Sequence, residues 1–460
     1  MKILIRNGTV VTPTGIHKTD LLLADGLIAE VNENLSCGDA NVIDASGKLL
    51  LPGGVDVHTH VTLNPDAATG SDIYFTATRA ALMGGTTSIV EHMGFTPQGR
   101  SVTEQMYLYE NLAAGQSSAD YGFHGLIQSS DNNFFPLLRA FAERGMTSVK
   151  AYMTYAQRCC DGQLSALLKA CAEQGILLAV HAEDHHCIQN GLAACSSPGH
   201  GDPIWHARSR PPECEAAAVQ RLLRIAADAG EAPVYIVHLS TASALSIIRK
   251  AREAGQRNIF VETCTQYLTL TEDRYSDPVS GVQYILSPPL RKQEDVDALW
   301  AGLRDGHIQT VATDHCSFSL AEKNRGLGDF TRCPGGAPGI EERVALLFSE
   351  GVGKGRLSLQ RFVEVMSANP AKLMGLYPRK GALQPGADAD IIMLDPQEDG
   401  ILSASNLHGP WGYTLYEGVP VKGSVEMVFL RGTCVVHNGF FLGQRGDGSL
   451  LCRQRFMEAH

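Results

Sequence analysis

The feature that most constrains the fold is a repeating alternation between residues 53 and 377. Eight short apolar runs of strand length are separated by segments long enough to hold a helix. This alternation is typical of a parallel sheet, because parallel strands need crossover connections that are usually helical. Eight repeats predict an α/β fold, the (β/α)8 TIM barrel. The runs are GGVDVHTH (53–60), TSIVEHMG (87–94), YGFHGLIQ (121–128), TSVKAYMT (147–154), ILLAVHAE (176–183), APVYIVHLS (232–240), NIFVETC (258–264) and IQTVATDHC (308–316).

The two ends of the chain have a different pattern. Residues 1–52 and 378–460 contain short, partly alternating apolar stretches interrupted by Gly, Asp and Asn. Such stretches are typical of β-strands joined by turns. We expect both ends to pair into one β-sandwich accessory domain beside a catalytic barrel formed by residues 53–377.

Composition narrows the class of protein. Apolar residues make up 44% of the 460 residues and charged residues 19%, which is typical of a large, well-buried fold. The 38 basic and 49 acidic residues give a net charge of −11, so we expect no nucleic-acid binding. No apolar run approaches the roughly 18 residues of a membrane span. The twelve cysteines are scattered without a CxxC pair, which predicts free thiols in a cytoplasmic protein.

Metal-binding side chains gather at the ends of the predicted strands, where barrel enzymes carry their chemistry. His58 and His60 lie two residues apart, so both imidazoles face the same side of the strand and can reach one ion. Asp56, on the same face, could orient a ligand or make a strand-end hydrogen bond. The other strand-end residues of this kind are Lys150, His181, His238 and Asp314.

Each of these residues alone has a structural alternative. A single strand-end histidine is more often a hydrogen-bonded structural residue than a ligand, and Asp314 could cap a helix. Their combination at five of eight strand ends favours a metal site, since neutral imidazole is the commonest metal ligand. Lys150 is the unusual member, because it lies within an apolar strand and lysine is rarely buried without a partner. The remaining histidines, His206 among them, are interpreted as structural.

With these residues in this order, the chain resembles the amidohydrolase superfamily, and within it the hydantoinase and dihydropyrimidinase family. The resemblance extends over nearly the whole chain and is closest to the bacterial aryl-hydantoinases. The motifs that carry it are PGGVDVHTH (52–60), GGTT (84–87), SRPPECEA (209–216), IVHLS (236–240), ETCTQYL (262–268), LSPPLR (286–291), VATDHCSFS (311–319), GDFTRCPGGAPGIEER (328–343) and GALQPGADADIIMLDP (381–396).

The resemblance implies a binuclear metal centre. In similar enzymes the lysine that matches Lys150 is carboxylated by CO2 (N6-carboxylysine), and this carbamate bridges two divalent metal ions, usually Zn2+, with Mn2+ as the alternative. Burial agrees with this chemistry, because it favours the neutral amine that attacks CO2. The implied ligands are His58, His60, Lys150 and Asp314 for one ion, and Lys150, His181 and His238 for the other.

The resemblance also implies a hydrolytic mechanism. A metal-activated hydroxide attacks the ring carbonyl, and Asp314 carries the proton to the leaving nitrogen. Tyr155 matches the tyrosine that donates a hydrogen bond to the developing oxyanion. Ser287 and Gly335 match the positions whose main chain holds the substrate. At Gly335 the chain departs from the family, which has Pro-Asn-Gly where this sequence has Pro-Gly-Gly.

Two loops bear on the substrate. Similar dihydroorotases have an arginine two residues after the HxH pair that grips a carboxylate, but Thr62 stands there in this chain. A carboxylated substrate is therefore not expected. In similar enzymes the loops after the first and fourth strands cover the exocyclic side chain, and here they predict a moderately apolar pocket. These loops are 61–72, with Leu63, and 152–162, with Tyr152 and Cys159.

The predicted function is the metal-dependent opening of small cyclic amides to N-carbamoyl amino acids. The substrates implied are 5-substituted hydantoins, especially aryl-hydantoins, together with dihydropyrimidines. An allantoinase-like hydrolase is one alternative. A non-catalytic scaffold, similar to the dihydropyrimidinase-related proteins, is the other, but such scaffolds lose metal ligands and all six are present here. The family further implies a homotetramer.

Overall fold

The eight predicted runs form one parallel sheet whose strand order follows the sequence. A computed structural model describes residues 2–36, 38–66, 72–131, 133–195 and 199–456. Thr59 forms a parallel bridge with His315, and the His60 amide donates to the His315 carbonyl at 2.6 Å, so the first and last strands also meet. The predicted TIM barrel is therefore confirmed. Its strands are β6 (Gly54–Thr59), β7 (Thr86–His92), β8 (Asp120–Leu126), β9 (Ser148–Tyr152), β10 (Leu177–His181), β11 (Val234–Ile236), β12 (Ile259–Cys264) and β13 (Thr310–Ala312).

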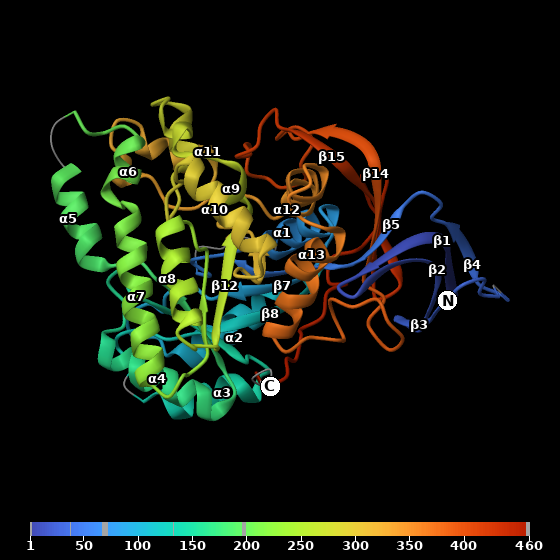
Figure 1. The fold of residues 1–460 in the computed structure, drawn as a ribbon, viewed down its shortest axis with the longest axis horizontal. Helices are drawn as coiled ribbons and strands as arrows, with labels where there is room; N and C mark the ends of the chain where they lie inside the picture. The colour runs from blue at the N-terminus through green and yellow to red at the C-terminus, as the bar shows by residue number, and fades with distance from the viewer. Residues whose placement is uncertain (1, 37, 67–71, 132, 196–198, 457–460) are drawn as a thin grey trace.

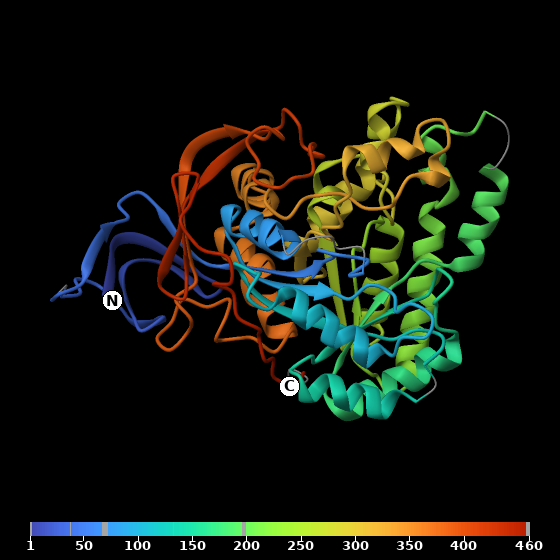
Figure 2. The same ribbon diagram turned by 180° about the vertical axis from the view of Figure 1, so that it is seen from behind.

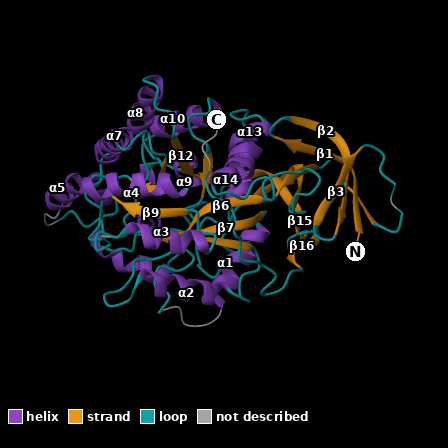
Figure 3. Cartoon of the chain, turned by 90° about the horizontal axis from the view of Figure 1, so that it is seen from below, coloured by secondary structure: helices purple, strands orange, loops and turns teal. Residues whose placement is uncertain are grey.

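Helices connect the strands and surround the barrel (Figure 3). Local signals set their ends: Ser101 and Glu104 form a capping box at the start of α2, and α4 ends at Gly175, whose φ of +64° suits glycine. The helices are α1 (Asp72–Met83), α2 (Val102–Ala113), α3 (Phe134–Glu143), α4 (Asp161–Gln174), α5 (His185–Cys195), α6 (Ile204–Ser209), α7 (Pro212–Asp228), α8 (Ala242–Glu253), α9 (Thr265–Thr269), α10 (Gln293–Arg304), α11 (Leu320–Lys323), α12 (Arg343–Leu347), α13 (Leu359–Val363) and α14 (Asn369–Leu373). Short 3-10 and π turns complete the connections. The 3-10 turns are η1 (Glu272–Tyr275), η2 (Ser280–Tyr284), η3 (Asn324–Gly326) and η4 (Phe330–Arg332), and the π turns are η5 (Phe348–Gly353) and η6 (Glu364–Ala368).

Both ends of the chain form one accessory β domain beside the barrel, as predicted (Figures 1 and 2). β5 pairs with β14, so the N-terminal and C-terminal segments are joined directly by hydrogen bonds. The nine strands form one connected sheet in the order β17-β16-β15-β14-β5-β1-β2-β3, with β4 on β1. They are β1 (Lys2–Thr12), β2 (Gly15–Ala24), β3 (Leu27–Asn32), β4 (Asn41–Asp44), β5 (Leu49–Pro52), β14 (Ile391–Ile401), β15 (Pro420–Leu430), β16 (Thr433–His437) and β17 (Phe440–Phe441).

After β17 the chain leaves this sheet and runs along the N-terminal ends of the barrel strands. Tyr121 exchanges backbone hydrogen bonds with residues 449 and 451, and the Phe456 amide donates to Gly175 just before β10. Arg453 inserts its buried side chain into the barrel floor, where Nη1 donates to Ser148 Oγ at 2.8 Å. The C-terminal segment therefore closes the face opposite to the one that carries the chemistry.

One expectation about the cysteines is wrong. Cys187 and Cys214 form a disulfide that joins α5 to α7, although sequence spacing predicted free thiols throughout. The pairing depends on two helices that tertiary structure brings together, and no local motif signals it. Cys37 lies outside the described residues. Within the described ranges, no helix is both long enough and apolar enough to cross a bilayer.

Candidate active site

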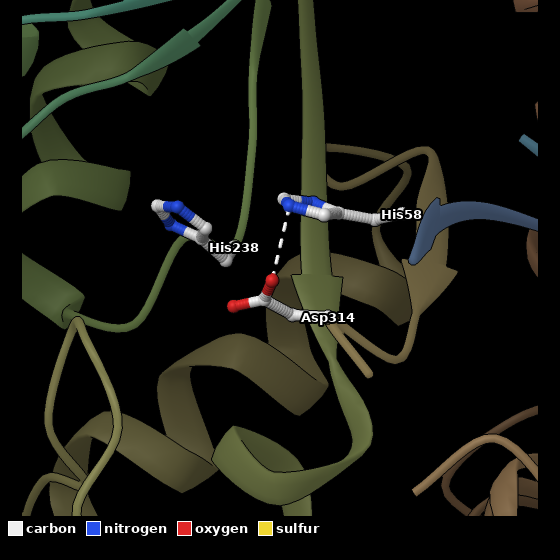
Figure 4. A group of neighbouring side chains, drawn as sticks. All are labelled: His58, His238 and Asp314. Carbon is white, nitrogen blue, oxygen red and sulfur yellow. Dashed lines mark ion pairs between the residues drawn. The ribbon is translucent and has the colours of Figure 1, made fainter. Parts of the chain in front are cut away.

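The predicted ligands converge at the carboxyl end of the barrel. The ligand atoms of His58, His238 and Asp314 all lie within 4.8 Å of one another (Figure 4). Asp314 Oδ1 lies 3.1 Å from His58 Nε2 and 3.3 Å from His60 Nε2. His238 Nε2 lies 2.9 Å from His181 Nδ1. The five residues thus form two neighbouring groups, one around Asp314 and one around the His181–His238 pair.

Lys150 is buried beside these groups. Its side chain is 2% exposed, and its Nζ has no hydrogen-bond partner in the described structure. Burial lowers the pKa of Lys150 to about 8. An unpaired amine of lowered pKa, next to imidazole nitrogens and a carboxylate, is a donor set that suits a divalent metal with nitrogen and oxygen ligands. The residues present therefore fit the metal centre that the resemblance implies.

Two carboxylates orient the histidine rings. Glu262 Oε1 lies 2.6 Å from His58 Nδ1, and Glu183 Oε2 lies 2.8 Å from His181 Nε2. Each carboxylate accepts a hydrogen bond from the ring nitrogen that points away from the centre. This hydrogen bond fixes the tautomer of the imidazole and raises the basicity of its other nitrogen, which faces the centre. Burial alone would raise the pKa of Glu183, but the Arg210 guanidinium and His181 hold it at about 2.

Sequence reasoning missed both carboxylates. Glu183 stands two residues after His181 in VHAED, and Glu262 begins ETC near the end of the seventh run. A search for a carboxylate partner of each histidine would have selected Glu183, because it is local. Asp56, proposed as such a partner, instead accepts from Thr313 Oγ1 at 2.6 Å and ties β6 to the end of β13. Of its two predicted roles, the strand-end hydrogen bond is the observed one.

Backbone geometry marks the same region. Tyr155, His238 and Asp314 have φ values of +70°, +41° and +52°, in the left-handed region that residues other than glycine rarely adopt. Asn, Asp and His tolerate this conformation better than other side chains, so the strain is greatest at Tyr155. Strain of this kind persists where the surrounding structure holds a side chain in a particular direction. Here it aims three side chains at one centre.

A cavity of about 850 Å³ opens onto this centre, within the usual range for small-molecule sites. Tyr155, Ser287 and Gly335 line it, next to the ligand groups. Its apolar lining includes Leu63, Phe95, Tyr152, Leu192 and Phe330. Leu63 and Tyr152 lie where the loop prediction put them, whereas Cys159 is buried elsewhere. Residues 67–71 of the first loop lie outside the described residues.

His92 is a third residue that sequence reasoning did not select. The centroid of its ring lies 4.0 Å from that of His124, in a stacked arrangement, and 4.3 Å from that of His58, in an edge-to-face arrangement. Burial holds its pKa well below the ordinary value, so the ring is neutral. His92 thus packs against the His58 ring, and His124 packs against His92. The sequence signal for His92 was its position at the end of a strand.

A TIM barrel with an HxH pair on its first strand, two more strand-end histidines, a buried lysine and a final aspartate is typical of the amidohydrolases. A model of the Amidohydrolase family matches residues 49–435. The D-phenylhydantoinase of Escherichia coli O9:H4 (strain HS) is 43% identical over 459 residues, which cover 99% of both chains.

Solved structures agree with this assignment. A dihydropyrimidinase from Brevibacillus agri NCHU1002 superposes with a TM-score of 0.96 at 39% identity and covers 100% of both chains. A D-hydantoinase from a Bacillus sp. AR9 gives 0.95 at 39% identity and covers 99% of this chain and 100% of its own. The chain therefore belongs to the amidohydrolase family and is a cyclic amidohydrolase of the hydantoinase/dihydropyrimidinase type.

Proposed function

We propose that this protein hydrolyses 5-substituted hydantoins, above all aryl-substituted ones, to N-carbamoyl amino acids. The observation that carries the proposal is the cavity, which joins the histidine–aspartate cluster to a lining that contains Leu63, Phe95 and Tyr152. An apolar lining beside polar groups suits a ring with one polar face and an aromatic substituent. The 43% identity to a D-phenylhydantoinase supports the same substrate class.

The metal centre is part of the proposal. His58, His60 and Asp314 would hold one divalent ion, His181 and His238 the other, and Lys150, as a carbamate, would bridge them. Two zinc ions would supply Lewis acidity and lower the pKa of a bound water. Manganese could replace zinc at ligands of this type.

The chain's own residues would bind the substrate and move the proton. Although burial raises the pKa of the Asp314 carboxyl, His58 and His60 hold it well below its ordinary value, so Asp314 is an anion able to accept a proton. Asp314 would pass that proton to the leaving ring nitrogen. Tyr155 would donate its phenol hydrogen to the oxygen on which negative charge develops. Main-chain groups at Ser287 and Gly335 would hold the ring amide.

The test is hydrolysis by protein produced with zinc and bicarbonate, with both enantiomers of 5-phenylhydantoin, dihydrouracil and allantoin as substrates. We expect kcat/KM to be highest for a phenylhydantoin. Faster hydrolysis of dihydrouracil or allantoin would move the proposal to those substrates. Absence of both bound metal and hydrolysis would support a scaffold. Tyr155→Phe should lower kcat roughly 100-fold with metals retained, whereas the control Tyr107→Phe, at a 47% exposed residue, should not.

The homotetramer remains a prediction from the family resemblance, and the cytosolic location remains a prediction from the scattered cysteines. Light scattering coupled to size-exclusion chromatography measures the first, and cell fractionation measures the second. The barrel boundaries, 53 and 377, are likewise proposed as the limits of the catalytic unit, to be tested by limited proteolysis.

A further inference from the structure

A fully buried lysine connects the two loops that carry Ser287 and Gly335. Lys323, at the end of α11, is 0% exposed. Its Nζ donates to the carbonyl oxygens of Ile285 at 2.7 Å, Pro334 at 2.8 Å and Gly336 at 2.9 Å. An ammonium has three N–H bonds, so every donor is used. Burial lowers the pKa of Lys323 to about 8, which leaves the charged form dominant at pH 7.

These carbonyls belong to the segments next to the proposed substrate contacts. Ile285 precedes Ser287 by two residues, and Pro334 and Gly336 flank Gly335 on both sides. The Gly336 amide also donates to the Ile285 carbonyl, at 3.1 Å, so one oxygen joins both loops.

Lys323 contacts these loops from outside the cavity. Ile285, Ser287, Gly335 and Gly336 line the cavity, whereas Lys323 is not among the lining residues. A Cβ built on Gly335 would lie 3.5 Å from Ser287 Oγ, so the two contacts are neighbours in space. Lys323 therefore binds the backbone of both loops without lining the cavity.

The composition of the second loop explains why such a support is needed. Gly335 and Gly336 are consecutive glycines, and Gly336 has a φ of +148°. Glycine has more conformational freedom to lose than any other residue, so this loop is held in place only if contacts outside it restrict its backbone. Charge-assisted hydrogen bonds are stronger than neutral ones, and Lys323 places one on each side of Gly335.

We propose that Lys323 is a positioning residue that sets the geometry of the main-chain substrate contacts at Ser287 and Gly335. This inference rests on the proposed function of the same site. Its consequence is specific: loss of the three N–H donors weakens substrate binding, while the metal ligands, which Lys323 does not contact in the described structure, stay in place.

The experiment compares Lys323→Met with Arg325→Met in the metal-loaded enzyme. Methionine removes the donors at similar volume, and Arg325 is an exposed residue two positions away. We expect KM for 5-phenylhydantoin to rise at least tenfold in Lys323→Met, with kcat within about threefold and two metals per subunit. Deuterium exchange in segment 334–337 should accelerate in parallel. Lys323→Gln keeps two donors, should give an intermediate KM, and preserves the test if Lys323→Met does not fold.

Several outcomes would overturn the inference. Exchange and KM equal to those of Arg325→Met would mean that Lys323 is not needed to hold the loops. Faster exchange with an unchanged KM would make it a structural residue only, and loss of metal would place its effect at the metal centre. If the wild-type enzyme hydrolyses no hydantoin, the proposed function fails, and the exchange measurement still tests the loop contacts separately.

Discussion

Replacing Lys150 by methionine should affect the metal-free and the metal-loaded protein in opposite directions. In the metal-free protein, Lys150 is a buried amine without a hydrogen-bond partner, and burial lowers its pKa from 10.5 to about 8. One pKa step corresponds to about 1.4 kcal/mol, so holding the ammonium in the folded state at pH 7 costs roughly 3 kcal/mol. Methionine removes that cost at similar size.

We therefore expect Lys150→Met to be more stable than the wild type in chelator at pH 7, by up to roughly 3 kcal/mol. The difference should shrink between pH 8 and 10.5, because the folded wild type then loses its proton while the unfolded chain still binds it. With zinc and bicarbonate the order should reverse, since the variant cannot form the bridging carbamate and wild-type stability gains from metal binding.

The assay is chemical denaturation with and without chelator, followed by metal analysis of the loaded proteins. The control is Lys169→Met, at an exposed position on α4, which should change stability by no more than about 0.5 kcal/mol. Short carboxylic acids should partly restore the activity of Lys150→Ala. Two metals and full activity in Lys150→Met would refute the carbamate. Lower stability of this variant in chelator at pH 7 would refute the unpaired ammonium.

Three further predictions concern other parts of the molecule. Glu183→Gln removes the charge that orients His181, so competition titration should show zinc affinity reduced about 10- to 100-fold; unchanged affinity would argue against this orienting role. Burial raises the pKa of the Glu342 carboxyl from 4.5 to about 7, so as pH rises through that interval the unfolded chain loses this proton first and the stability of the wild type falls. In denaturation experiments Glu342→Gln should be as stable as the wild type below pH 5 and more stable by up to roughly 3 kcal/mol at pH 8. An equal difference in stability at both pH values would contradict this. Gly335→Asn should fold with a melting temperature equal to or above that of the wild type, because the added Cβ meets only Ser287 Oγ at 3.5 Å; a fall of several degrees would show that the loop needs glycine there.

Much of the site could be predicted because it lies at strand ends. The HxH pair, the late aspartate and the buried lysine are each tied to an apolar run, and a parallel barrel brings all strand ends to one face. The same logic extended to the fold, since eight runs separated by helix-length segments leave few other arrangements. The sequence predicted that the two chain ends form the accessory sheet, whereas the hydrogen-bonded pairing of β5 with β14 came from the structure.

The rest depended on contacts between segments with no shared local pattern. Glu262 reaches His58 across 204 residues of sequence, and Lys323 serves carbonyls that are 38, 11 and 13 residues away. The Cys187–Cys214 disulfide likewise joins two helices. The sequence alone determined which strand ends carry reactive groups, because side-chain alternation and apolar length are local properties. Only the tertiary structure decided which carboxylate orients each histidine and which lysine holds the loops, because those choices follow from distances that chain folding creates.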